Sequence, residues 1–152
     1  IPSPWDSSTV PRLKASKPSH PIAKKIMRKI EALTLNAIDP HNSIKKDWSR
    51  KNMAVYFSSD KSNCSIYLHG NLICEVWPDE IYFQDAGWKT NTTKSRINII
   101  SNFFGVPGVY QRQGKWFVDK KTPWTGSASY ELPVNQYGAI GRFIDYRNYL
   151  PH

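Results

Sequence analysis

Hydrophobic and polar residues alternate in short segments along much of the chain, with the period of two that is typical of β-strands. The segments with this period are residues 53–57, 64–69, 72–77, 81–84, 109–112, 115–118 and 129–132. Short polar turns separate several of them, among them Gly70-Asn71, Pro78-Asp79-Glu80 and Gln113-Gly114. Neighbouring strands are therefore expected to pair antiparallel, as a meander followed by a separate hairpin.

Two other segments have the period of an amphipathic helix. The first is predicted over residues 21–36, with Pro21 in its first turn and Ile22, Ile26, Ile30 and Leu33 on one face. The second is predicted to be capped by Thr90 or Thr92 and to end at Gly105. The resulting fold class is α+β, an antiparallel sheet of about four to six strands with two helices packed on one face.

The chain divides by composition into an arm and one domain. Residues 1–20 are rich in Pro and Ser and are expected to form a flexible arm without regular structure. Residues 21–152 are expected to form a single α+β domain, with its sheet and helix core over residues 53–132. The chain has 152 residues, of which 39% are hydrophobic. That content excludes a wholly disordered chain, and no segment has the roughly 18 apolar residues of a membrane-spanning helix.

The two cysteines are too few for a disulfide scaffold, and no Cys/His spacing resembles a zinc site. A two-residue turn at Gly70-Asn71 places Cys64 and Cys74 on opposite faces of the hairpin, so both are expected to be reduced thiols. No cofactor and no metal are indicated.

Positive charge suggests an acidic partner. The net charge is +9, and residues 1–61 hold 12 Lys/Arg against 5 Asp/Glu. Nucleic acid is the commoner partner for such a bias, with DNA favoured over RNA and a membrane not expected. The alternative is that many small proteins are basic without binding anything in particular. The cations of the first helix, which can follow phosphates or form a solvated face, are Lys24, Lys25, Arg28 and Lys29.

The start of the second helix is the most specific candidate site. Helix N-termini favour acidic residues, yet this one carries Lys94 and Arg96, with Lys89 just before it. Hydroxyl donors from Thr92 and Thr93 complete the features of a phosphate site. Trp88 is placed to stack on a base or sugar. The alternative is that the threonines only cap the helix, Lys94 is solvated and Trp88 fills the core.

The predicted hairpin over residues 109–118 carries a weaker version of the same signal. Arg112, Lys115 and Trp116 flank its turn and can contact a nucleic-acid backbone or minor groove. An exposed hairpin tip without function has the same composition, so this alternative stays open.

Catalysis is the least favoured class. His69 and Cys74 lack a third orienting group, so they make a poor nucleophile pair. Asp79, Glu80 and Asp85 could hold a metal ion, but they are more simply explained as turn residues. No acid, base or metal-ligand set has convincing spacing for an enzyme.

The middle of the chain carries two further motifs, His69-Gly70-Asn71-Leu72-Ile73 and the segment from Gly87 to Asn98. They resemble the HGN-x-I hairpin and the following G-W-x-T-x-T-T-(K/R)-x-R-(L/I)-N segment of a family of small proteins encoded by tailed phages. The resemblance implies a phage origin and a module of hairpin then helix, and it transfers no catalytic or binding residue.

The leading hypothesis is a phage-encoded, non-catalytic nucleic-acid-binding protein of the host cytoplasm or the virion. The alternative is a protein-interaction role, as a virion component or an effector that binds a host protein, because aromatic residues are common interface anchors. Exposed aromatics beside the Lys/Arg surface favour nucleic acid, whereas exposed aromatics far from it favour a protein partner. Oligomeric state does not follow from the sequence.

Overall fold

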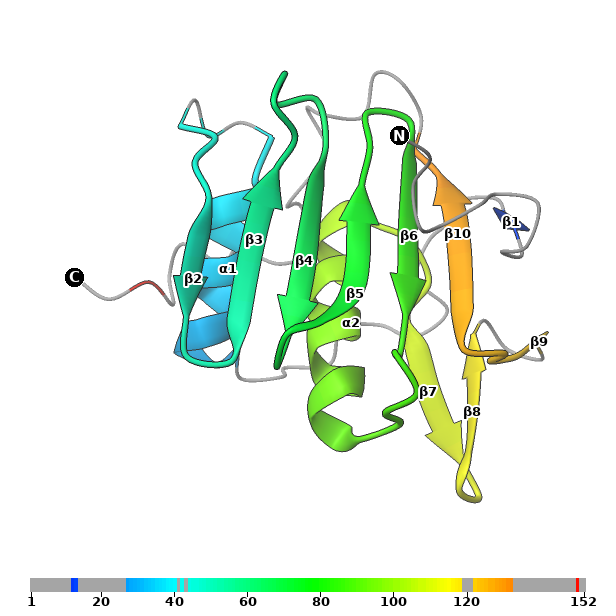
Figure 1. The fold of residues 1–152 in the computed structure, drawn as a ribbon. Coiled ribbons are helices and arrows are strands. Elements are labelled where there is room, and N and C mark those ends of the chain that lie inside the picture. Colours follow the sequence, from blue (N-terminus) through cyan, green and yellow to red (C-terminus); the bar gives the residue numbers. More distant parts are fainter. Residues whose placement is uncertain are drawn as a thin grey trace.

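The computed structural model describes residues 12–13, 27–40, 42, 44–118, 122–132 and 150. These residues form a seven-stranded sheet with two helices on one face and a three-stranded sheet beside it (Figure 1). The α+β class and the packing of both helices on one face are thus confirmed. Among the described residues, no helix is long and apolar enough to cross a membrane.

The seven-stranded sheet is mostly a meander. Its strands are β1 (Arg12–Leu13), β2 (Trp48–Arg50), β3 (Met53–Phe57), β4 (Cys64–Leu68), β5 (Asn71–Val76), β6 (Glu80–Gln84) and β10 (Ser127–Glu131). Strands β2 to β6 pair antiparallel in chain order, as the alternating pattern predicts. The sheet is extended by β10, which pairs antiparallel with β6, and then by β1, which pairs parallel with β10.

Strand β1 lies within the predicted arm and corrects part of that prediction. Arg12 and Leu13 lie in a β-strand, so the expected absence of regular structure fails at these two residues. The rest of residues 1–20 lies outside the described residues. Local turn signals cannot reveal such a pairing, because β1 and β10 are more than a hundred residues apart in the chain.

Both helices cover the same sheet face and run in the same direction along it (Figure 1). The first, α1 (Lys29–Ile38), contributes Ala32, Leu35 and Ile38 to the core. The second, α2 (Asn91–Phe104), buries Ile97, Ile100 and Phe103 among others. Facing them are the inward residues of β3 to β6, namely Met53, Val55, Cys64, Ile66, Leu68, Cys74, Val76, Ile81 and Phe83. One continuous hydrophobic core results.

The first helix begins later than predicted. Met27 and Arg28 precede it, and Arg28 has the extended main chain of an N-cap, so the expected range 21–36 is wrong at its start. Glu31 explains the start, because its Oε1 accepts a hydrogen bond from the Arg28 main-chain N–H at 3.1 Å. Residues 21–26, including Lys24 and Lys25, lie outside the described residues.

The β4–β5 hairpin turns one residue earlier than predicted. Its two turn residues are His69 (φ 51°) and Gly70 (φ 78°), and Leu68 pairs with Asn71. A β-bulge at Ile73 then shifts the register so that Ile66 faces Cys74. Cys64 and Cys74 therefore both point into the core, which corrects the predicted opposite faces; both thiols are free, as expected.

Candidate nucleic-acid interface

The N-terminus of α2 offers hydrogen-bond donors and no acidic residue. Thr90 is the N-cap, as predicted, and its Oγ1 accepts the Thr93 main-chain N–H at 3.1 Å. Thr93 is buried and its hydroxyl lies 3.0 Å from that of Thr90, so it belongs to the cap. Among the described residues, the main-chain N–H groups of Asn91 and Thr92 have no acceptor. An anion placed there would meet these two donors and the positive end of the helix dipole.

A tight turn held by Asp85 presents Trp88 in front of this helix end. Ala86 (φ 55°) and Gly87 (φ 84°) both adopt left-handed main-chain geometry, and the Asp85 carboxylate accepts the Gly87 N–H at 2.8 Å. The other oxygen of that carboxylate accepts the indole N–H of Trp124 at 2.8 Å. Trp88 is 62% exposed, so it does not fill the core. Asp85 therefore has a structural role, and no group of acidic, His or Cys residues that could hold a metal occurs in the described ranges.

A pocket of about 460 Å³ lies between the β4–β5 hairpin and the start of α2. The hairpin side supplies His69, Asn71 and Ile73, and the other side supplies Trp88 and Thr92. Leu68, Asp85, Thr90 and Thr93 complete the lining. The two sequence segments that carry the phage-family resemblance thus both line one pocket, although residues 74–86 separate them in the chain.

The second sheet adds cations at the same end of the molecule as the start of α2 (Figure 1). Its strands are β7 (Val109–Arg112), β8 (Lys115–Val118) and β9 (Thr122–Pro123). Asn98 of α2 fixes the hairpin, because its side-chain amide accepts the Val109 N–H at 2.7 Å and donates to the Val109 carbonyl at 2.8 Å. Lys94 Nζ reaches Gln111 Oε1 at 3.2 Å. The hairpin tip, which carries exposed Arg112 and Lys115, projects at the same end of the molecule as the start of α2 (Figure 1).

We use the name basic surface for the exposed and half-exposed groups at this end of the molecule, which are Trp88, Lys89, Asn91, Thr92, Lys94, Arg112 and Lys115. Lys89 lies 3.6 Å from the Asp85 carboxylate, while its side chain stays 53% exposed. Within the described ranges, Lys94, Arg112 and Lys115 have no carboxylate partner, so their positive field is not neutralised locally.

Two of the predicted contact residues are buried away from this surface. Arg96 is 4% exposed, and its guanidinium donates to Glu31 Oε2 at 2.8 Å. Ser95 donates to the same oxygen at 2.6 Å. We call Glu31, Ser95 and Arg96 the α1–α2 junction. Trp116 is 7% exposed and packs in the core, so neither it nor Arg96 is available for a ligand.

The role of Glu31 at the centre of this junction is not evident from the sequence. A glutamate in a basic amphipathic segment is normally solvated, and only its position one turn after the N-cap hinted at a structural role. Arg28 and Lys29 are exposed at the start of α1. They supplement the positive charge at the helix N-termini, but no contact joins them to the pocket.

Neither cysteine is a reactive thiolate at neutral pH. Burial raises the pKa of the Cys64 thiol to about 12 and the pKa of Cys74 well above 9.0, so both stay protonated at neutral pH. His69 is exposed at its turn, whereas Cys74 is fully buried. The considered His69–Cys74 nucleophile pair is therefore not assembled.

Comparison with known proteins places the chain in a phage family. The model of the Kyanoviridae Gp96 protein family matches residues 27–134, and the chain belongs to this family. The phage origin implied by the motif resemblance is thereby confirmed. No curated protein and no solved structure matches the chain.

Proposed function

We propose that this phage protein binds nucleic acid through the basic surface, without catalysis. The observation that carries the proposal is the exposed Trp88 beside a pocket at the α2 N-terminus, with Lys89 and Lys94 next to it. Lys94 has no carboxylate partner among the described residues, and Lys89 stays half exposed although it pairs with Asp85. An aromatic ring in the same region as such cations allows stacking and phosphate attraction to act together. In a phage protein, such an activity is expected in the host cytoplasm or the virion.

Each part of the surface has a separate task in this proposal. The oxygens of a phosphate accept hydrogen bonds from the free main-chain N–H groups of Asn91 and Thr92, and its negative charge attracts Lys94. A base stacks on Trp88 or enters the adjacent pocket, where His69 and Asn71 face its edge. Arg112 and Lys115 contact further phosphates along the strand. Arg96, Trp116 and Thr93 support the scaffold and touch no ligand.

This division favours an unpaired strand as the ligand. Stacking on Trp88 requires a base that is free of its duplex neighbours, and the pocket accepts one group between two walls. The positive groups contact phosphates and do not read base edges, so binding is expected to be weakly sequence-specific. DNA is favoured over RNA, and we expect single-stranded DNA to bind more tightly than a duplex.

The test measures binding of labelled single-stranded DNA, duplex DNA and RNA by fluorescence anisotropy across a salt series. The wild type is expected to bind single-stranded DNA with a Kd of roughly micromolar at low salt, and its association constant should fall linearly with salt concentration on logarithmic axes. The paired variant Lys94→Gln with Arg112→Gln is expected to reduce the salt slope by about 2.

Two further variants identify the surface. Trp88→Ala is expected to weaken single-strand binding by about fivefold or more and duplex binding less. Lys46→Gln with Lys61→Gln removes the same charge from other exposed positions and should leave binding nearly unchanged. Equal losses in both double variants, or no binding even at low salt, would contradict the proposal.

A protein-binding role is the second candidate, and exposed apolar residues favour it. Ile44 is 69% and Tyr56 is 49% exposed, and neither lines the pocket beside Trp88. Aromatic and aliphatic side chains of this kind anchor protein interfaces. Absence of nucleic-acid binding, together with capture of a phage or host protein that depends on Tyr56, would establish this role in place of the first.

A further inference from the structure

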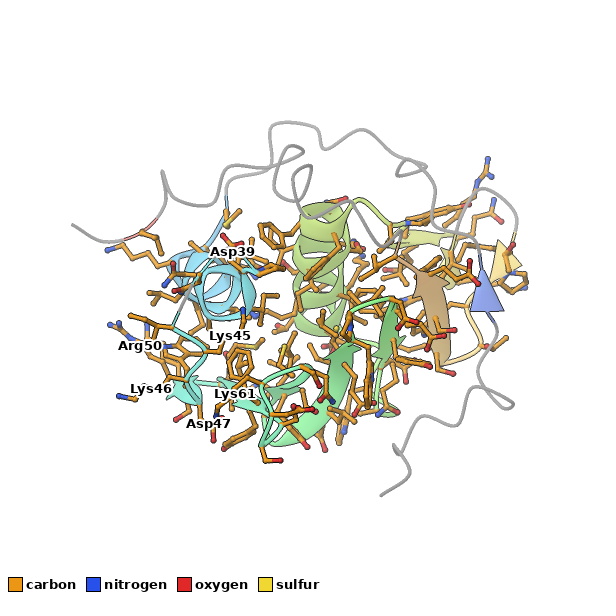
Figure 2. All side chains as sticks on the ribbon, turned by 90° about the horizontal axis from the view of Figure 1, so that it is seen from above. Asp39, Lys45, Lys46, Asp47, Arg50 and Lys61 are labelled. Atoms are coloured by element: carbon orange, nitrogen blue, oxygen red, sulfur yellow. The ribbon has the colours of Figure 1, made fainter. Side chains whose placement is uncertain are left out.

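A second pocket, of about 340 Å³, lies at the opposite end of the molecule, where α1 and α2 end. Figure 2 views this end, with Lys45 beside α1 and Lys61 over the turn between β3 and β4. Its walls are apolar, built from residues of both helices and of three strands or strand ends, including Ile38, Phe57, Val76 and Phe104. This composition is typical of a small-molecule site, which combines an apolar lining with a few polar groups.

Polar residues also line this pocket, namely Lys45, Lys61, Ser62 and Asn63, and the two lysines carry the charge that orients a ligand here. Lys45 Nζ donates to the main-chain carbonyls of Pro40 and Asn42, at 3.3 Å each, which holds the ammonium at the end of α1. Lys61 is exposed at the turn. In the described part of the chain, neither lysine forms an ion pair with a carboxylate. A positive potential without a counter-ion therefore faces an apolar cavity.

Three carboxylates lie near this pocket without lining it. One of them, Asp60, accepts hydrogen bonds from the Ser58 and Ser62 hydroxyls, which lower its pKa to about 2, so it holds its negative charge in the turn beside Lys61. Asp39 and Asp47 lie at the same end in Figure 2, but neither lines the pocket. The Asp47 carboxylate is engaged by the Phe57 main-chain N–H at 2.8 Å. Cys64, which does line the pocket, is a buried protonated thiol and acts as an apolar wall.

We propose that this pocket binds a small apolar monoanion, of the class of a medium-chain or aromatic carboxylate. The hydrocarbon part fills the space between Phe57, Val76 and Phe104, and the anionic group meets Lys45 and Lys61 at the pocket lining. This site is separate from the basic surface, because the two pockets share no lining residue. Its occupancy is independent of nucleic-acid binding.

The experiment uses octanoate as the probe, with octan-1-ol and octylamine as matched neutral and cationic controls. Binding is measured by isothermal titration calorimetry and by displacement of the fluorescent anion 8-anilinonaphthalene-1-sulfonate. Octanoate is expected to bind at least about tenfold more tightly than octan-1-ol, and octylamine more weakly than either. Equal affinities for octanoate and octan-1-ol would overturn the role of the lysines.

Variants locate the site. Lys61→Met, at an exposed position, and Lys45→Met with Lys61→Met are expected to weaken octanoate binding progressively, to about tenfold or more in the double variant. Lys46→Met with Lys51→Met removes equal charge from exposed residues outside the pocket and should leave it unchanged. Val76→Phe is expected to fill the pocket and to abolish binding of octanoate and of 8-anilinonaphthalene-1-sulfonate. Octanoate binding that survives Val76→Phe, or no octanoate binding to the folded wild type, would overturn the proposal.

Discussion

The α1–α2 junction and the basic surface share the first turns of α2, yet they use positive charge in opposite ways. In the junction, Arg96 is buried and its charge is balanced by Glu31 at 2.8 Å. On the basic surface, Lys94 stands two residues earlier, and its partner within the described ranges is the neutral amide of Gln111. The first arrangement joins two helices, and the second leaves a positive field directed outward.

The difference shows that charge becomes available for binding only where no internal acid balances it. The motif segment from Gly87 to Asn98 contains both kinds of residue. Arg96 and Asn98 hold the scaffold, through Glu31 and Val109 respectively, while Trp88 and Lys94 face outward. A count of basic residues in this segment therefore overstates the number that can contact a ligand.

The largest expected effect breaks the junction. Glu31→Ala leaves the Arg96 guanidinium buried without its partner and is expected to lower the free energy of unfolding by about 3–5 kcal/mol. Urea denaturation measures this loss. Lys94→Ala is the exposed comparison and should change stability by about 0.5 kcal/mol or less. Similar losses in the two variants would remove the distinction between the regions.

The next effect separates the hairpin from α2. A Cβ at Gly108 would clash with Asn98 Oδ1 and would lie 2.8 Å from Ser101 Oγ. Gly108→Ala is therefore expected to break the two hydrogen bonds between Asn98 and the Val109 main chain. We expect a loss of about 1–3 kcal/mol in stability. Because Arg112 and Lys115 move with the hairpin, nucleic-acid affinity should fall as well. Unchanged melting and unchanged affinity in this variant would show that Asn98 does not position the cations.

A smaller effect concerns the cap at the pocket wall. Thr90→Ala removes the acceptor of the Thr93 N–H and should cost about 1 kcal/mol of stability. Thr90→Ser keeps the hydroxyl and should differ from the wild type by only about a few tenths of a kcal/mol. Thermal melting followed by circular dichroism compares the two. Equal destabilisation by Ala and Ser would assign the effect to the methyl group instead of the cap.

The smallest effect is a single exposed charge at the hairpin tip. Lys115→Gln should leave stability unchanged and reduce the salt slope of single-stranded DNA binding by about 1. Lys46→Gln is its matched control and should leave the slope as it is. A slope that is the same in all three proteins would remove Lys115 from the basic surface.

Local sequence patterns predicted most elements of the fold, and they also indicated the α2 start as the candidate site, which stays a prediction. The alternation around residues 53–84 and the cap and stop signals at Thr90 and Gly105 correspond to strands and a helix in the structure. These features depend on neighbours in the chain, which is why the sequence reveals them. The exposed Trp88 beside Lys94 follows from the same kind of signal.

Pairings between distant segments were not predictable in this way. Nothing near Glu31 or Arg96 in sequence indicates that they meet across 65 residues, and a charged helical residue is exposed by default. The bulge at Ile73 changes the face of Cys74 by a single extra residue, which an alternating pattern cannot distinguish from regular pairing. The second pocket is likewise formed by residues from five separate parts of the chain.

Strand β2 ends the seven-stranded sheet in the part of the chain that the structure describes. Such an edge exposes unpaired main-chain groups and can recruit a strand from another copy, which leads to aggregation. Here the strand is only three residues long and carries exposed Arg50, with exposed Lys46 and Lys51 around it. A second copy would bring the same cations to the same edge, so their repulsion disfavours edge-to-edge assembly when the protein is abundant.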